Sequence, residues 1–180
     1  MTERAHREHL GPISAEVDAP AALTFQMLAA IGQGAPQPGE EARVLSRDGD
    51  SLVCEFVTSV PLPLGWTRQV RTTEAVRIVP PDRIEFEHLD GPVRGLRETI
   101  VVEPIGSRRS RIVYRGTYPA SGGIAGHAVR LLSRGAIKRA VEQHLDDLRG
   151  RAEQRAARSR LFASPPGAIR ASPDPMGGVD

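Results

Sequence analysis

Six polar side chains that can bind a ligand or transfer a proton share the apolar phase of strands predicted between residues 66 and 118. They are Arg68, Glu74, His88, Glu98, Tyr114 and Tyr118. Successive side chains of a strand point to opposite faces, so the phase that carries most large apolar residues points to the core. An unpaired polar group in a dry core costs about 1–3 kcal/mol, and more if it is charged. These side chains therefore pair with one another or line a wet cavity.

The first of the expected pairs joins two neighbouring strands. A turn centred near Pro80 and Pro81 places Glu74 opposite His88, at the cross-strand Cβ spacing of about 5 Å. A carboxylate beside an imidazole raises the histidine pKa toward neutrality and fixes its tautomer, which suits general acid–base catalysis. In the alternative interpretation, His88 is a satisfied core histidine or lies in solvent at the end of the sheet.

The last predicted hairpin brings a second carboxylate to the same face. Its expected register puts Glu98 opposite Gly116, where the glycine would leave room for a ligand, with Tyr114 and Tyr118 as diagonal neighbours. The tyrosines are candidate proton donors, although core aromatics with a hydroxyl at the edge would follow the same pattern. A reversed strand phase would expose Glu98 and bury Arg97 instead.

Arg68 and four further residues are candidate ligand contacts. Arginine is rarely buried without an anion, so Arg68 indicates a carboxylate partner, supplied by a ligand, by Glu74 or by Glu98. The other four are Trp66, Phe56, Phe86 and His127, of which His127 lies on the predicted long helix. The single cysteine, Cys54, is expected to be a small buried apolar group.

The elements that must position these residues are two helices and about seven strands. Alternation of period two predicts strands at 13–17, 42–47, 51–60, 66–78, 83–89, 94–103 and 110–118. A first helix is predicted after Asp18 as N-cap, with Pro20 in its first turn, and a second from Ile124 to about Arg158. Short turns imply antiparallel neighbours. We therefore expect an α+β fold, in which a curved antiparallel sheet wraps around the long C-terminal helix and a short helix follows the first strand.

Residues 12–158 are expected to form one ligand-binding domain. Residues 1–11 and 159–180 are predicted to be flexible tails, because they lack a periodic pattern or are rich in proline and glycine. The segments 32–40 and 61–65 are predicted to be mobile loops at the mouth of the cavity.

Two stretches of this sequence resemble the START-related superfamily, usually called SRPBCC, which includes polyketide cyclases and dehydratases. In VDAPAALTFQML the residues Val17, Ala19, Pro20, Phe25 and Leu28 match its opening strand and helix. The run VVEPIGSRRSRIVYRGTY resembles its later hairpin, with Ser110 where a threonine is usual. The resemblance covers residues 12–156 and implies a helix-grip fold. It does not settle function, since that fold serves carriers, enzymes and partner-binding domains.

Composition and motifs exclude several classes of protein. The chain of 180 residues has no glycine-rich nucleotide loop, no zinc-hydrolase motif and no nucleophile elbow, so we expect neither cofactor nor metal. It also has no long apolar segment and no secretory signal at its start, which favours a cytoplasmic protein, monomeric or homodimeric, that is not inserted in a membrane. A net charge of +2 is weak support for a nucleic-acid partner, although RGRAEQRAARSR leaves polyanion binding open beside a simple solvated helix end.

Two of the three remaining hypotheses share a hydrophobic small molecule held between sheet and long helix. The resemblance implies a cyclase or dehydratase, with His88 and Glu74 as base and acid, Tyr114 or Tyr118 as donor to an enolate, and Arg68 as anchor for an acidic or thioester end. The alternative is a non-catalytic carrier or sensor of a lipid or other apolar ligand. A third hypothesis is a partner-binding module that works through the arginine-rich end of the helix.

Overall fold

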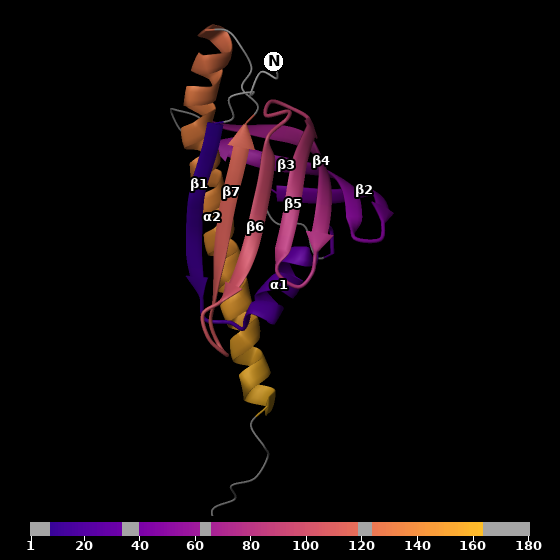
Figure 1. Cartoon of the computed structure of the whole chain (residues 1–180), viewed down its shortest axis with the longest axis vertical. Coiled ribbons are helices and arrows are strands. Elements are labelled where there is room, and N and C mark those ends of the chain that lie inside the picture. The colour runs from indigo at the N-terminus through magenta and orange to yellow at the C-terminus, as the bar shows by residue number, and fades with distance from the viewer. Residues whose placement is uncertain (1–7, 34–39, 62–65, 119–123, 164–180) are drawn as a thin grey trace, which may run out of the picture.

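The structure of the chain is a computed structural model that describes residues 8–33, 40–61, 66–118 and 124–163 (Figure 1). Side chains of residues 124–134, on the first turns of the long helix, lie outside the described part. So do residues 1–7, 34–39, 62–65, 119–123 and 164–180, which include most of the two predicted mobile loops. The mobility expected of those loops therefore remains a prediction.

Seven antiparallel strands form one sheet in the order β1-β7-β6-β5-β4-β3-β2. The strands are β1 (Glu8–Val17), β2 (Glu40–Asp48), β3 (Ser51–Pro61), β4 (Thr67–Val79), β5 (Arg83–Asp90), β6 (Arg97–Pro104) and β7 (Ser110–Tyr118). The helices are α1 (Ala21–Ala29) and α2 (Ile124–Ala163). The chain thus has the helix-grip fold that its sequence predicts, with α2 running along the sheet beside β1 (Figure 1).

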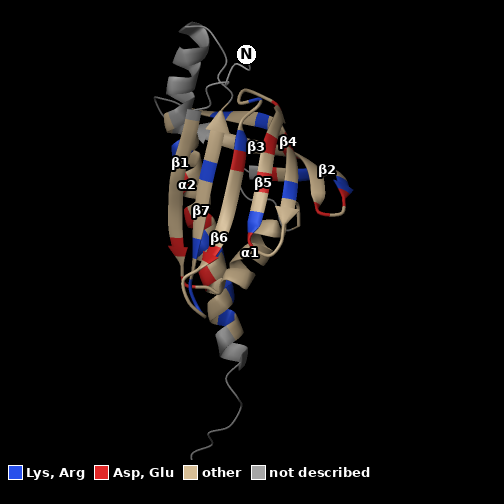
Figure 2. Ribbon diagram, in the orientation of Figure 1, with Lys and Arg blue, Asp and Glu red and all other residues tan. Residues whose placement is uncertain are grey.

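One continuous core joins the concave face of the sheet to both helices. Leu145, Leu148 and Ala152 of α2 are at most 3% exposed and pack with the alternate residues of the strands that point inward, such as Leu52 and Val76. On the opposite phase the strands carry charged residues of both signs (Figure 2), joined by cross-strand ion pairs such as Arg71–Glu55 and Arg97–Glu87, each at 2.9 Å. The inward and outward phases are those predicted from alternation.

The first helix begins differently from the prediction. Its N-cap is Pro20, with no side-chain cap, and Asp18 lies before it, with its backbone N–H donating to Oε1 of Glu153 at 3.1 Å. Buried hydroxyls hold this corner instead. Oγ of Ser110 donates to the carbonyl of Ala19 at 3.0 Å and lies 3.0 Å from Oγ1 of Thr24, and both side chains are fully buried. The helix is therefore anchored to β7 by hydrogen bonds with large sequence separation.

Three element boundaries also differ from the sequence prediction by more than two residues. The strand β1 begins at Glu8, inside the predicted tail, because pairing with β7 continues across an irregularity between Leu10 and Ile13 that disrupts the alternation. The helix α2 continues to Ala163 rather than ending near Arg158, while β6 begins at Arg97 after a turn. Within the described residues no helix is both long and apolar enough to cross a membrane.

Candidate active site

A buried pair of side chains joins β4 and β5 at the position the sequence predicts. Glu74 and His88 are cross-strand partners, and the side chain of each is less than a tenth exposed. Oε1 of Glu74 lies 3.3 Å from Nδ1 of His88, but the two atoms are not aligned as a hydrogen bond. The hydroxyl of Thr72 donates to that same Oε1 at 2.6 Å. The contact between His88 and Glu74 is therefore electrostatic, and Thr72 fixes the carboxylate that makes it.

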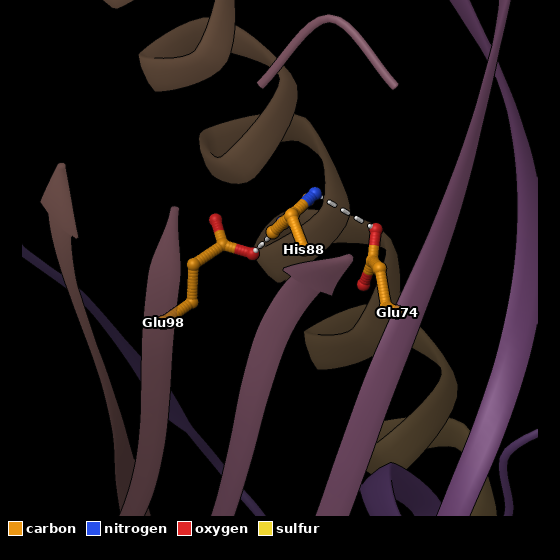
Figure 3. A group of neighbouring side chains, drawn as sticks. All are labelled: Glu74, His88 and Glu98. Carbon is orange, nitrogen blue, oxygen red and sulfur yellow. Dashed lines mark hydrogen bonds and ion pairs between the residues drawn. The ribbon is translucent and has the colours of Figure 1, made fainter. Parts of the chain in front are cut away.

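A second carboxylate binds the other side of the imidazole ring. Oε2 of Glu98, on β6, lies 2.7 Å from Nε2 of His88, and its Oε1 accepts a hydrogen bond from the hydroxyl of Tyr114, on β7, at 2.5 Å. Figure 3 shows His88 between the two carboxylates. Because β4, β5, β6 and β7 are consecutive neighbours in the sheet, the polar side chains form one continuous relay across four strands. We call Thr72, Glu74, His88, Glu98 and Tyr114 the relay.

Burial and charge alter the proton affinity of three relay members. Burial raises the pKa of Glu74 above its ordinary 4.5, although the charge of His88 and the hydrogen bond from Thr72 oppose that rise. Burial alone would lower the pKa of His88, but the hydrogen bond to Glu98 and the charges of both glutamates outweigh it and raise that pKa above 6.5. Burial and the neighbouring carboxylates also raise the pKa of Tyr114, which stays protonated as a donor. The site therefore places a carboxyl group of raised pKa next to an imidazole that keeps its second proton to higher pH than an ordinary histidine.

The same three residues offer ligand atoms of the kinds that metals bind. One atom each from Glu74, His88 and Glu98 lie within 4.8 Å of one another. The two carboxylates, however, contact different ring nitrogens of His88, at 3.3 and 2.7 Å, and those nitrogens point away from each other. A metal at the usual distance of about 2.0–2.2 Å from all three residues would use one ring nitrogen of His88, so at least one carboxylate would have to leave the nitrogen that it now contacts. The observed geometry thus fits a proton relay better than a metal centre.

The remaining predicted site residues divide into three groups. Phe56 and Phe86 are half-buried and pack against the core, and Tyr118 is buried. Trp66 and Arg68 were expected on the inward face of the site, but Trp66 is 73% exposed and Arg68 is exposed. The side chain of His127 lies outside the described residues. The cavity expected between sheet and long helix remains a prediction.

The exposure of Arg68 and Trp66 has a simple cause in the sheet. Arg68 shares the phase of Thr72 and pairs with Val60 of β3, but β5 pairs with β4 only from Thr73 onward. This end of β4 therefore projects as a two-stranded ribbon that has less surface to pack against. The burial expected of Arg68 is therefore wrong.

Three features of the relay were missed by the sequence interpretation, the first of which is the hydrogen bond between His88 and Glu98. Thr72 lies two residues before Glu74 on the same face, and this spacing was the available signal that its hydroxyl could reach the carboxylate. Gly116 does stand opposite Glu98 as predicted, but a Cβ there would lie 2.8 Å from the hydroxyl oxygen of Tyr114. The space assigned to a ligand is thus taken by the tyrosine hydroxyl.

A groove of about 540 Å³ also lies along the sheet, lined by residues such as Ala75, Arg77, Glu85 and Thr99. These belong to the outward phase, opposite to the one that carries His88 and Glu74. Although Glu98 borders the groove, neither His88 nor Glu74 lines it. The groove therefore meets the relay at Glu98, and the inward residues Leu52, Val76 and Phe86 line it as well.

Comparison with known proteins places this fold among related ones. Residues 13–153 match the family described as polyketide cyclase/dehydrase and lipid transport. The Zhui aromatase/cyclase from Streptomyces sp. R1128 is similar in structure, with a TM-score of 0.69 and 20% identity over 83% of this chain and 96% of that one. A protein from Thermus thermophilus gives a TM-score of 0.61 and 21% identity, over 88% and 100% of the two chains. A START superfamily protein from Mycobacterium smegmatis gives 0.54 and 14%, over 78% and 99%. No curated protein matches the sequence.

Proposed function

The chain belongs to the polyketide cyclase/dehydrase and lipid transport family, and on this premise we propose that it binds a hydrophobic carbonyl compound and acts on it by general acid–base catalysis. The observation that carries the proposal is the relay, in which one buried imidazole is held between two carboxylates. A buried group of this kind is costly to maintain, and perturbed titratable groups concentrate at sites where protons are transferred.

The pKa directions assign a separate role to each partner of the central pair. Burial makes the Glu74 carboxylate a stronger base, so it removes the acidic proton beside the substrate carbonyl. His88 holds its proton to higher pH because of the hydrogen bond to Glu98 and the two negative charges, so it acts as the acid. Nδ1 is the nitrogen that donates, since Nε2 is bound to Glu98.

These roles give a balanced dehydration of a β-hydroxy carbonyl compound. Glu74 takes the α-proton, the electron pair of that C–H bond forms the carbon–carbon double bond, and the β-hydroxyl leaves as water with the proton from Nδ1 of His88. The products are the unsaturated carbonyl compound, water, protonated Glu74 and neutral His88. Proton transfer from Glu74 to Nδ1, whose separation in the resting site is 3.3 Å, restores the starting state. Cyclisation needs the same first step, with the resulting enolate attacking a second carbonyl.

The other relay members position this pair. Glu98 accepts from both His88 and Tyr114, so the imidazole ring is held with Nδ1 toward Glu74. The Tyr114 hydroxyl is therefore occupied as a donor to Glu98. Arg68 is exposed at the sheet end and has no part in the proposed chemistry. Half-buried Phe56 and Phe86 supply apolar surface on the relay face, which favours the hydrophobic part of a substrate.

The test uses aldol adducts of acetone with benzaldehyde, naphthaldehyde and octanal, which share a β-hydroxy ketone and differ in their apolar part. We expect at least one adduct to bind and to lose water, and His88→Asn to slow that loss about a hundred- to ten-thousand-fold while binding is retained. His9→Asn, an exposed residue of β1, is the matched control. Equal binding without turnover in wild type would instead show a carrier of apolar ligands, and no binding of any adduct would contradict the proposal.

A further inference from the structure

Tyr114 reaches Glu98 by passing over a residue without a side chain. Tyr114 and Gly116 lie two residues apart on β7, so both face inward. Gly116, and not Tyr114, is the cross-strand partner of Glu98, while Tyr114 is the partner of Ile100. The tyrosine hydroxyl therefore reaches its acceptor diagonally, across the position where a side chain at residue 116 would stand.

The space over Gly116 is too small for even a methyl group. A Cβ there would lie 2.8 Å from the hydroxyl oxygen of Tyr114, 3.2 Å from Cβ of Leu10 and 3.3 Å from Cδ1 of Leu10. The contact with the hydroxyl is the shortest of the three and falls below normal van der Waals separation. Glycine in a strand interior weakens the strand and commonly marks a close approach of another group. Here the group that approaches is the end of the relay.

We infer that Gly116 is a positioning residue: its missing side chain seats the Tyr114 hydroxyl on Glu98, and Glu98 so held fixes the ring of His88. The inference rests on the proposed function for its catalytic consequence only. The arrangement itself joins residues of β5, β6 and β7 by two hydrogen bonds. A methyl group at residue 116 displaces the hydroxyl from Glu98 and so has the same effect on His88 as deletion of the hydroxyl.

A double-mutant cycle tests this equivalence on the ligand-free protein. The titration midpoint of the His88 ring is measured by heteronuclear NMR in wild type, Gly116→Ala, Tyr114→Phe and the double variant. We expect each single variant to move the midpoint in the same direction by about half a unit or more, and the double variant to move no further than Tyr114→Phe. The contact with Leu10 is present in both backgrounds and cancels in the cycle. Gly106→Ala, with nothing near its Cβ position, is the control and keeps the wild-type midpoint.

Additive shifts would overturn the inference, as would a wild-type midpoint in Gly116→Ala or Tyr114→Phe. If Gly116→Ala does not fold, we expect the double variant to recover folding, since the hydroxyl is the group that clashes. Failure of both would place the decisive clash at Leu10 and contradict the inference. Because no ligand is present, the result is independent of the proposed function: a chain that binds and converts none of the adducts would still show the coupled midpoints.

Discussion

Replacing Glu98 by glutamine removes a charged hydrogen bond from His88 and keeps the size of the side chain. The bond is 2.7 Å long, and the side chains it joins are 14% and 8% exposed, so solvent screens it little. A hydrogen bond to a charged group contributes about 1.5–3 kcal/mol. At 1.36 kcal/mol for each pKa unit, Glu98→Gln should lower the pKa of His88 by about 1–2 units.

The sign of this pKa change follows from the balance of effects at His88. Burial favours the neutral ring, and the hydrogen bond to Glu98 is the largest of the effects that raise the pKa above 6.5. The extra stability that the charged ring gives the fold is fully present below pH 6.5 and is lost as the pH rises through the folded pKa, so this loss should shrink in Glu98→Gln. NMR titration of the ring, assigned with His88→Asn, measures the shift. Glu87→Gln, on the outward phase of β5, should leave it unchanged, and a pKa in Glu98→Gln equal to that of wild type would refute the reasoning.

Three further outcomes follow from the relay and the helix anchor. Turnover should be bell-shaped in pH, with an acid limb above 4.5 where Glu74 protonates and an alkaline limb above 6.5 where His88 loses its proton; a flat profile would contradict these roles. Thr72→Val should move only the acid limb upward in pH. In the wild-type protein the hydrogen bond from Thr72 lowers the pKa of Glu74, and the variant loses that bond. Urea denaturation should show Ser110→Ala less stable by about 1–3 kcal/mol, against under about 0.5 kcal/mol for exposed Ser51→Ala. Equal losses for the two serines would argue against the buried anchor.

Much of the site could be predicted because strand register is a local property. The turn at Pro80 and Pro81 sets Glu74 opposite His88, and alternation then puts both side chains on the core face. The same reasoning placed Glu98 opposite Gly116, since only a short connection separates their strands. Alternation predicts the face of the sheet to which each residue points, and that face was right at each of these positions.

Burial and side-chain reach depend on more distant parts of the chain, and there the sequence was insufficient. Whether Arg68 is covered depends on where β5 stops pairing with β4, which no local pattern reveals. The occupant of the space at Gly116 depends on the rotamer of Tyr114. Asp18 is of a residue type that commonly caps helices. The start of this helix is anchored instead by Ser110, distant in sequence, which donates a hydrogen bond to the carbonyl of Ala19.

The central claim is that Glu74 and His88 exchange protons with a bound carbonyl compound. Its most direct test is the exchange of the α-protons of the acetone–benzaldehyde, acetone–naphthaldehyde and acetone–octanal adducts with heavy water, followed by proton NMR. The account predicts exchange well above the buffer rate for the adduct that binds, and a return to the buffer rate in Glu74→Gln. Exchange at the buffer rate in the wild-type protein, with the adduct bound and no water lost from it, would contradict it.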